Sequence, residues 1–94
     1  MKEAARQPCV LLVEDNPADV FLIRLLLGRV ACAVELHVAT DGEKALDLLD
    51  VRLDPPYLIL LDLNLPKLDG WELLRRIKSR PERYFAPVVV LSSA

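Results

Sequence analysis

The chain has 94 residues, of which 53% are apolar and 28% charged, and its formal net charge is −2. This length allows one small domain, and the apolar content is ample for a core, so the composition excludes an intrinsically disordered chain. The balance of charge excludes a strongly basic nucleic-acid binder, and no apolar run reaches the roughly 20 residues that cross a bilayer. Because the N-terminus carries no signal-peptide pattern, we expect a cytoplasmic domain that binds neither nucleic acid nor membrane.

An apolar run followed by a capping signal marks the first strand and helix. Cys9–Val13 is continuously apolar, which is typical of a strand buried on both faces of a sheet. Asn16 and Pro17 then predict a helix start, because Asn caps helices and Pro is tolerated at their first position. The helix extends to about Arg29, with Asp19 lying off the apolar stripe formed by Val20, Ile23 and Leu27.

A second strand and a second helix follow in the same way. Val34–Ala39 alternates apolar and polar residues, which predicts a strand with one wetter face, near an edge of the sheet. Asp41 and Gly42 form a turn and a cap. The apolar spacing beyond them predicts a helix to about Leu49 or Asp50.

The second half of the chain repeats this alternation. Tyr57–Leu61 is another buried strand, and the loop Leu63–Gly70 comes after it. Apolar residues at helical spacing predict a third helix from Trp71 to about Arg80, where a proline ends or interrupts it. Pro87–Leu91 is a fourth apolar strand. Strands separated by helices predict right-handed crossovers, and hence an α/β fold with a parallel sheet.

Polar side chains follow three of the four predicted strands. In chain order they are Glu14 and Asp15, then Asp62, then Ser92. In a parallel sheet of this kind, ligands bind at the carboxyl ends of the strands. Each residue alone has an ordinary explanation as part of a turn or loop. The inference of a site therefore depends on finding all of them at one edge of the sheet.

These residue types indicate metal-assisted phosphoryl chemistry. Three carboxylates at one edge repel one another unless a cation lies among them. A set of oxygen ligands without His or Cys favours Mg²⁺ over Zn²⁺. One aspartate can then act as a nucleophile and form an aspartyl phosphate, while a hydroxyl on the neighbouring strand hydrogen-bonds a phosphoryl oxygen.

Three stretches of the chain form motifs, namely Leu11–Asn16, Ile59–Pro66 and Pro87–Ser93. Together they resemble a known family, the response-regulator receiver domains of bacterial two-component systems. Leu11–Asn16 resembles the first-strand motif of that family, and Pro87–Ser93 resembles its fourth strand with the switch hydroxyl. Ile59–Pro66 resembles the phosphoacceptor motif, with Asp62 as the phosphoacceptor. The residues that meet the family's spacing after this aspartate are Asn64, Pro66 and Gly70.

The resemblance implies a flavodoxin-like doubly wound sheet and a signalling role rather than an enzyme activity. In such a domain Asp62 takes a phosphoryl group from the phosphohistidine of a sensor histidine kinase. Asp15 binds Mg²⁺ directly and Glu14 binds it through water, while Asn64 offers its backbone carbonyl to the metal. Ser92 contacts the phosphoryl group and shifts on activation.

The same resemblance assigns further roles. Pro66 and Gly70 shape the loop under the site, with Gly70 supplying backbone freedom. Ser93 affects the rate of dephosphorylation. The sequences of Asn16–Val20 and of Arg75–Ser93 look most like those of single-domain regulators that partner bacterial phytochrome-type kinases.

The sequence departs from the family on its C-terminal side. Receiver domains have five helices and five strands in the order 2-1-3-4-5, so we expect residues 1–94 to form a single receiver domain, incomplete at the C-terminus, with the order 2-1-3-4. The fifth strand, its phosphate-pairing lysine and the last two helices are then missing. Val88–Leu91 becomes an edge strand, which invites a homodimer or an edge-strand assembly. Truncation of a longer protein, such assembly, and fusion to another segment stay open as explanations.

Two other functions compete with the phosphoacceptor. One is a Mg²⁺-dependent phosphohydrolase of the haloacid-dehalogenase type, which also uses an aspartate nucleophile after a parallel strand. That family carries a second Asp two residues later, where this chain has Asn64. The other is a phosphorylation-incompetent receiver fragment that acts only in protein interaction. The full acidic set argues against this fragment, and the missing lysine argues for it.

Overall fold

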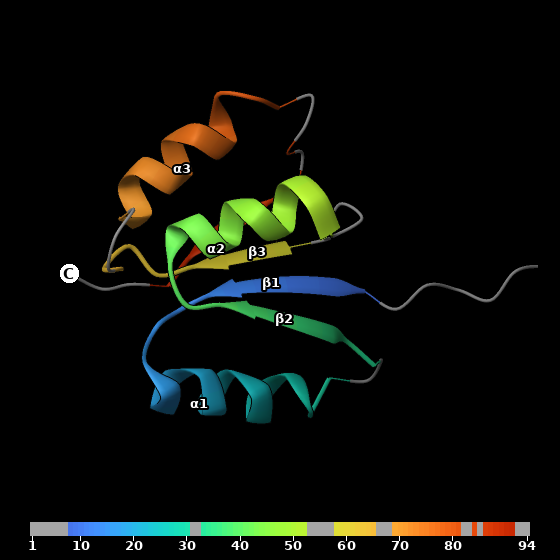
Figure 1. The fold of residues 1–94 in the computed structure, drawn as a ribbon. Helices are drawn as coiled ribbons and strands as arrows, with labels where there is room; N and C mark the ends of the chain where they lie inside the picture. The colour runs from blue at the N-terminus through green and yellow to red at the C-terminus, as the bar shows by residue number, and fades with distance from the viewer. Residues whose placement is uncertain are drawn as a thin grey trace, which may run out of the picture.

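The computed structural model of the chain describes residues 8–30, 33–52, 58–65, 69–81, 84 and 86–91. Four parallel strands form one sheet in the order β2-β1-β3-β4, which confirms the predicted topology. Helix α1 covers one face of this sheet, and α2 and α3 cover the other (Figure 1). The fold is therefore a doubly wound α/β sandwich. The strands are β1 (Cys9–Val13), β2 (Glu35–Ala39), β3 (Leu58–Leu61) and β4 (Val88–Val90).

Helices α1 and α2 begin directly after the predicted capping residues Asn16 and Asp41, whereas the ends of the helices differ from prediction. Helix α1 spans Pro17–Leu27, and its expected last turn continues only as a hydrogen-bonded turn beyond Gly28. Helix α2 spans Gly42–Asp47 and passes directly into a π-helical turn, η1, at Leu48–Arg52. Helix α3 spans Gly70–Lys78. None of the helices in the described part of the chain has the length and apolar character that a membrane span requires.

Alternate residues of the central strands supply two separate cores. Leu11 of β1 and Ile59 of β3 point to the face that α2 and α3 cover, and both are fully buried. Leu12 of β1 points to the opposite face, where it packs with residues of α1. This alternation is the two-residue period of a strand, so a continuous apolar run is required where both faces are covered. The prediction that β1 is buried on both faces is confirmed.

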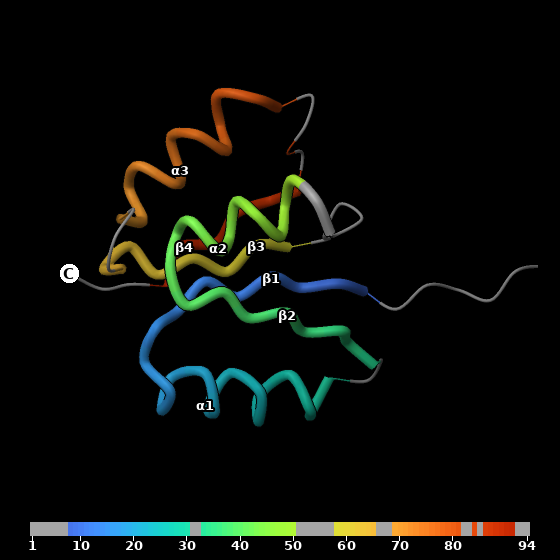
Figure 2. Tube along the Cα trace, viewed as in Figure 1, coloured from blue at the N-terminus to red at the C-terminus, as the bar shows by residue number. Residues whose placement is uncertain are grey.

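The two outer strands are more exposed than the two inner ones. Glu35 in β2 is exposed and the next three residues are half-buried, as the predicted edge position requires. Strand β4 lies behind α2 in the view of Figure 2 and pairs only with β3 among the described residues. Val89 and Val90 in this strand are 45% and 41% exposed. The carboxyl ends of all four strands point the same way, toward the end of the sheet that carries the acidic residues.

Candidate functional site

Backbone hydrogen bonds of the sheet continue one residue past β1 and β3 and fix two of the predicted acidic residues. The amide of Glu14 donates to the carbonyl of Ala39 at 2.9 Å. The amide of Asp62 donates to the carbonyl of Val13 at 3.0 Å. Both carboxylates therefore start from backbone that is as rigid as the strands, which suits a site that must hold a fixed geometry.

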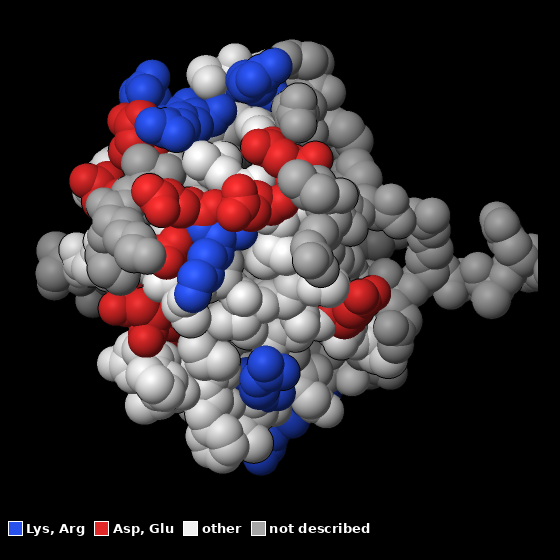
Figure 3. Space-filling model, in the orientation of Figure 1, with Lys and Arg blue, Asp and Glu red and all other residues white. Residues whose placement is uncertain are grey.

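The structure brings three of the predicted carboxylates together. Glu14, Asp15 and Asp62 each offer an oxygen atom, and these atoms all lie within 4.8 Å of one another. Glu14 is only 4% exposed, whereas Asp15 is exposed and Asp62 is half-buried. Acidic side chains also lie on the surface near this end of the sheet, and basic side chains gather over α3 (Figure 3).

Burial and neighbouring charge make Glu14 hard to ionise. Loss of solvent, followed by hydrogen bonding and charge repulsion from Asp62, raises the pKa of Glu14 to about 8. The charge of Asp19 acts in the same direction, and a hydrogen bond from the amide of Asn16 opposes it. No Lys or Arg of the described part of the chain is among the groups that shift the pKa of Glu14. Oxygen donors that repel one another in this way fit a hard divalent cation, which would be held by Glu14, Asp15 and Asp62.

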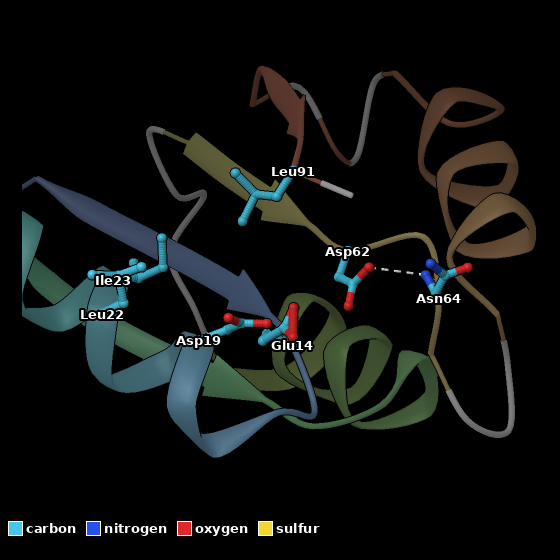
Figure 4. Close-up of a pocket in the computed structure, with 7 residues that line it drawn as sticks. All are labelled: Glu14, Asp19, Leu22, Ile23, Asp62, Asn64 and Leu91. Carbon is cyan, nitrogen blue, oxygen red and sulfur yellow. Dashed lines mark hydrogen bonds between the residues drawn. The ribbon is translucent and has the colours of Figure 1, made fainter. Parts of the chain in front are cut away.

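Asp62 lies in the wall of a cavity of about 400 Å³. The amide of Asn64 donates to Oδ1 of Asp62 at 3.0 Å, and the other carboxylate oxygen of Asp62 turns toward Glu14 (Figure 4). Apolar residues form the opposite side of the cavity. The described residues that line it are Glu14, Asp19, Leu22, Ile23, Asp62, Asn64 and Leu91.

Asp19 is the one polar cavity residue that the sequence analysis did not assign to the site. Helical periodicity placed it off the apolar stripe of the first helix and indicated no role for it in the site. In the structure it stands in the first turn of α1, on the same cavity as Glu14 and Asp62. The signal that could have found it is position alone, because the first turn of a helix after β1 faces the carboxyl edge of the sheet.

The sequence predicted that Gly70 is needed for its backbone freedom, and this reason was wrong. This residue is the first of α3, and its backbone has no conformation that favours glycine. A Cβ atom there would lie 2.4 Å from the Cα of Leu63 and 2.5 Å from the carbonyl oxygen of Asp62. The amide of Gly70 also donates to the carbonyl of Leu63 at 3.1 Å. Glycine is therefore required for the close approach of α3 to the backbone that carries Asp62.

Three of the residues named from the sequence lie outside the described part of the chain, namely Pro66, Ser92 and Ser93. The described chain reaches Leu91, whose amide donates to the carbonyl of Leu61 at 2.8 Å. Leu91 also lines the cavity. In the sequence it directly precedes the residue that is predicted to carry the switch hydroxyl.

Comparison with known proteins gives a consistent result. The family model of the response regulator receiver domain matches residues 10–94. The chain is 42% identical over 90 residues to the response regulator Rcp1 of Synechocystis sp., covering 90% of this chain and 61% of the relative. It is 43% identical over 90 residues to the probable methanogenesis regulatory protein FilR2 of Methanothrix harundinacea, covering 90% of this chain and 57% of the relative. The chain thus spans about three fifths of these relatives.

Solved structures show the same likeness. The phosphorylated cyanobacterial phytochrome response regulator RcpA superposes with a TM-score of 0.88 at 42% identity, over 95% of this chain and 67% of that one. The Mn(2+)-bound form of response regulator Rcp1 gives 0.85 at 41% identity, over 93% and 66%. The bacteriophytochrome response regulator AtBRR gives 0.86 at 40% identity, over 96% and 69%. The chain therefore belongs to the family of response regulator receiver domains.

Proposed function

We propose that this receiver domain accepts a phosphoryl group on Asp62. The observation that carries the proposal is the placement of Asp62 in the cavity wall, where one oxygen is held by the amide of Asn64 and the other turns toward Glu14. A carboxylate with one oxygen fixed presents the second in a defined direction, which lowers the entropic cost of attack. The likeness to a phosphorylated phytochrome response regulator supports the same reading.

The reaction moves one phosphoryl group between two protein side chains. An oxygen of Asp62 forms a bond to phosphorus as the bond from phosphorus to the donor histidine nitrogen breaks, and the product is an acyl phosphate. The donor nitrogen keeps the electron pair and can take up a proton. We propose a sensor histidine kinase as the donor and place the reaction in the cytoplasm, where such kinases draw on ATP. The domain then assists only the gain and loss of its own phosphoryl group and is not an enzyme for other substrates.

We propose Mg²⁺ as the cation of this site. Glu14, Asp15 and Asp62 would hold it, with the backbone carbonyl of Asn64 as a further ligand. Mg²⁺ prefers oxygen donors and bridges carboxylates to phosphoryl oxygens, so it would offset the negative charge of the entering group. The support is the cluster of three carboxylates within 4.8 Å and the likeness to a Mn(2+)-bound response regulator.

Incubation with Mg²⁺ and a small phosphodonor, followed by intact-mass measurement, tests the proposal. We expect one phosphoryl group on the chain, none on Asp62→Asn, and an unchanged adduct on Asp47→Asn, which removes the same charge from the exposed surface of α2. Repeated turnover of a phosphate ester would instead support the phosphohydrolase. Absence of any adduct would leave a domain that acts only through protein interaction.

We also propose that the described residues form one receiver domain that associates through β4. This strand pairs with β3 on one side only within the described part of the chain, and Val89 and Val90 present exposed apolar side chains. A strand edge of that kind presents backbone donors and acceptors to another strand. A second copy of the chain can satisfy them, which gives a homodimer or a longer edge-strand assembly.

A further inference from the structure

Asp19 is a charged residue of the cavity for which no capping hydrogen bond to its own helix is found among the described residues. A carboxylate in the first turn of a helix commonly accepts a hydrogen bond from the amide of the capping residue. Here the amide of Asn16 points instead to Oε2 of Glu14, at 3.4 Å, and the side chain of Asn16 accepts from the amide of Ala18 at 2.9 Å. No hydrogen bond or ion pair of Asp19 is found among the described residues.

The carboxylate of Asp19 faces the acidic cluster without belonging to its inner set. Figure 4 shows it turned toward Glu14, on the side away from Asp62. It is not one of the three carboxylates whose oxygens lie within 4.8 Å of one another. A cation among those three would therefore have Asp19 as a further carboxylate, just outside its direct ligands.

We propose that Asp19 is a positioning residue of the cation site, which strengthens divalent-cation binding from outside the direct ligands by its charge and by accepting a hydrogen bond from cation-bound water. This inference depends on the proposed cation site and deepens it. A hydrated cation such as Mg²⁺ keeps several water molecules, and those waters need acceptors on the open side of the site. Asp19 is the acidic residue that the cavity offers there.

The size of the effect follows from the charge and its exposure. Asp19 is exposed, so solvent and salt weaken its interaction with the cation. A single charge several ångströms from a divalent ion in such a setting changes the affinity by roughly three- to tenfold. Direct loss of an inner ligand would cost much more.

Titration of the full chain with Mn²⁺, with the free ion followed by electron paramagnetic resonance, tests the inference without any measurement of activity. We expect Asp19→Asn to bind Mn²⁺ roughly three- to tenfold more weakly at low salt, with a smaller difference at high salt. Asp47→Asn, which removes an exposed charge outside the cavity, should stay within about twofold of the unmodified chain. Asp19→Glu keeps the charge and should bind more tightly than Asp19→Asn.

The possible outcomes separate this inference from the site on which it depends. If the unmodified chain binds no Mn²⁺, the proposed cation site is wrong and the role of Asp19 falls with it. If the unmodified chain binds but Asp19→Asn binds equally well or better, only the role of Asp19 is overturned. Equal weakening in Asp19→Glu and Asp19→Asn would also overturn it. Thermal unfolding without cation checks that each variant is folded, since loss of an acid from the first turn of a helix is a small structural change.

Discussion

Among the titratable residues that the structure describes, Glu14 shows a large change in pKa. Its pKa is raised to about 8 from a usual value of 4.5 by burial and by Asp62. The folded chain therefore holds this proton more tightly than the unfolded chain. The stabilisation is fully present below about pH 4.5, and it is lost as the pH rises toward and through about 8.

Unfolding by urea in the presence of a chelator, between pH 5 and 8.5, measures this linkage. We expect the free energy of unfolding to fall with pH, and we expect Glu14→Gln to show a shallower fall because its side chain does not ionise. Asp47→Asn changes an exposed carboxylate outside the cluster and should keep the original slope. Identical slopes in all three proteins would contradict the assignment.

Gly70 gives a second prediction at the scale of a single residue. In Gly70→Ala the new methyl group would meet the backbone of Leu63 and Asp62 at distances that require α3 to move. We expect a loss of about 1–3 kcal/mol of stability and slower phosphorylation, since the backbone that carries Asp62 moves too.

Gly28 provides the matched control for that substitution. It lies at the end of α1 with ordinary helical backbone angles, and a Cβ atom there would touch only carbonyl oxygens, at 3.4 Å. Gly28→Ala should therefore be neutral, or stabilising by about 0.4–1 kcal/mol. Chemical denaturation of both variants checks the pair, and similar losses in the two would show that the close approach at Gly70 does not matter.

Strand β4 carries the prediction at the scale of an element. If its edge pairs with a second copy, size-exclusion chromatography with light scattering should show a dimer or larger species that Val89→Lys converts to monomer, because a charged edge residue disfavours strand pairing. Leu25→Lys alters an equally exposed apolar residue on α1 and should leave the assembly intact. A monomer at high concentration of the unmodified chain would rule out edge pairing.

Elements with a strong local signal were predicted well, and those that depend on packing were not. The caps formed by Asn16 and Asp41 are both present, each accepting a hydrogen bond from an amide of the first helical turn. The cap formed by Asp69, which accepts from the amide of Glu72 at 2.8 Å, was not predicted. Asp69 lies inside the stretch that the sequence predicted as a loop, so the sequence did not mark where the helix begins. The π-helical turn η1 also has no sequence signature.

At the scale of the whole molecule, the strand order decides which residues meet. Alternating elements predicted a parallel sheet, but periodicity alone does not say that β1 lies between β2 and β3. The order came from the resemblance of three motifs to receiver domains, and the structure confirms it. Asp19 was missed because the helical pattern tells only which side of α1 is apolar. Its place on the cavity depends on how α1 lies against the sheet end.

The central claim is that Asp62 receives the phosphoryl group, and the most direct test is to locate that group. Borohydride reduction of the phosphorylated chain converts an acyl phosphate on an aspartate into a homoserine, which peptide mapping can place. We predict this conversion at Asp62 alone, dependent on Mg²⁺ and unaffected by Asp47→Asn. Conversion at Asp15 or another acidic residue, or a phosphoryl group that resists reduction, would contradict the account.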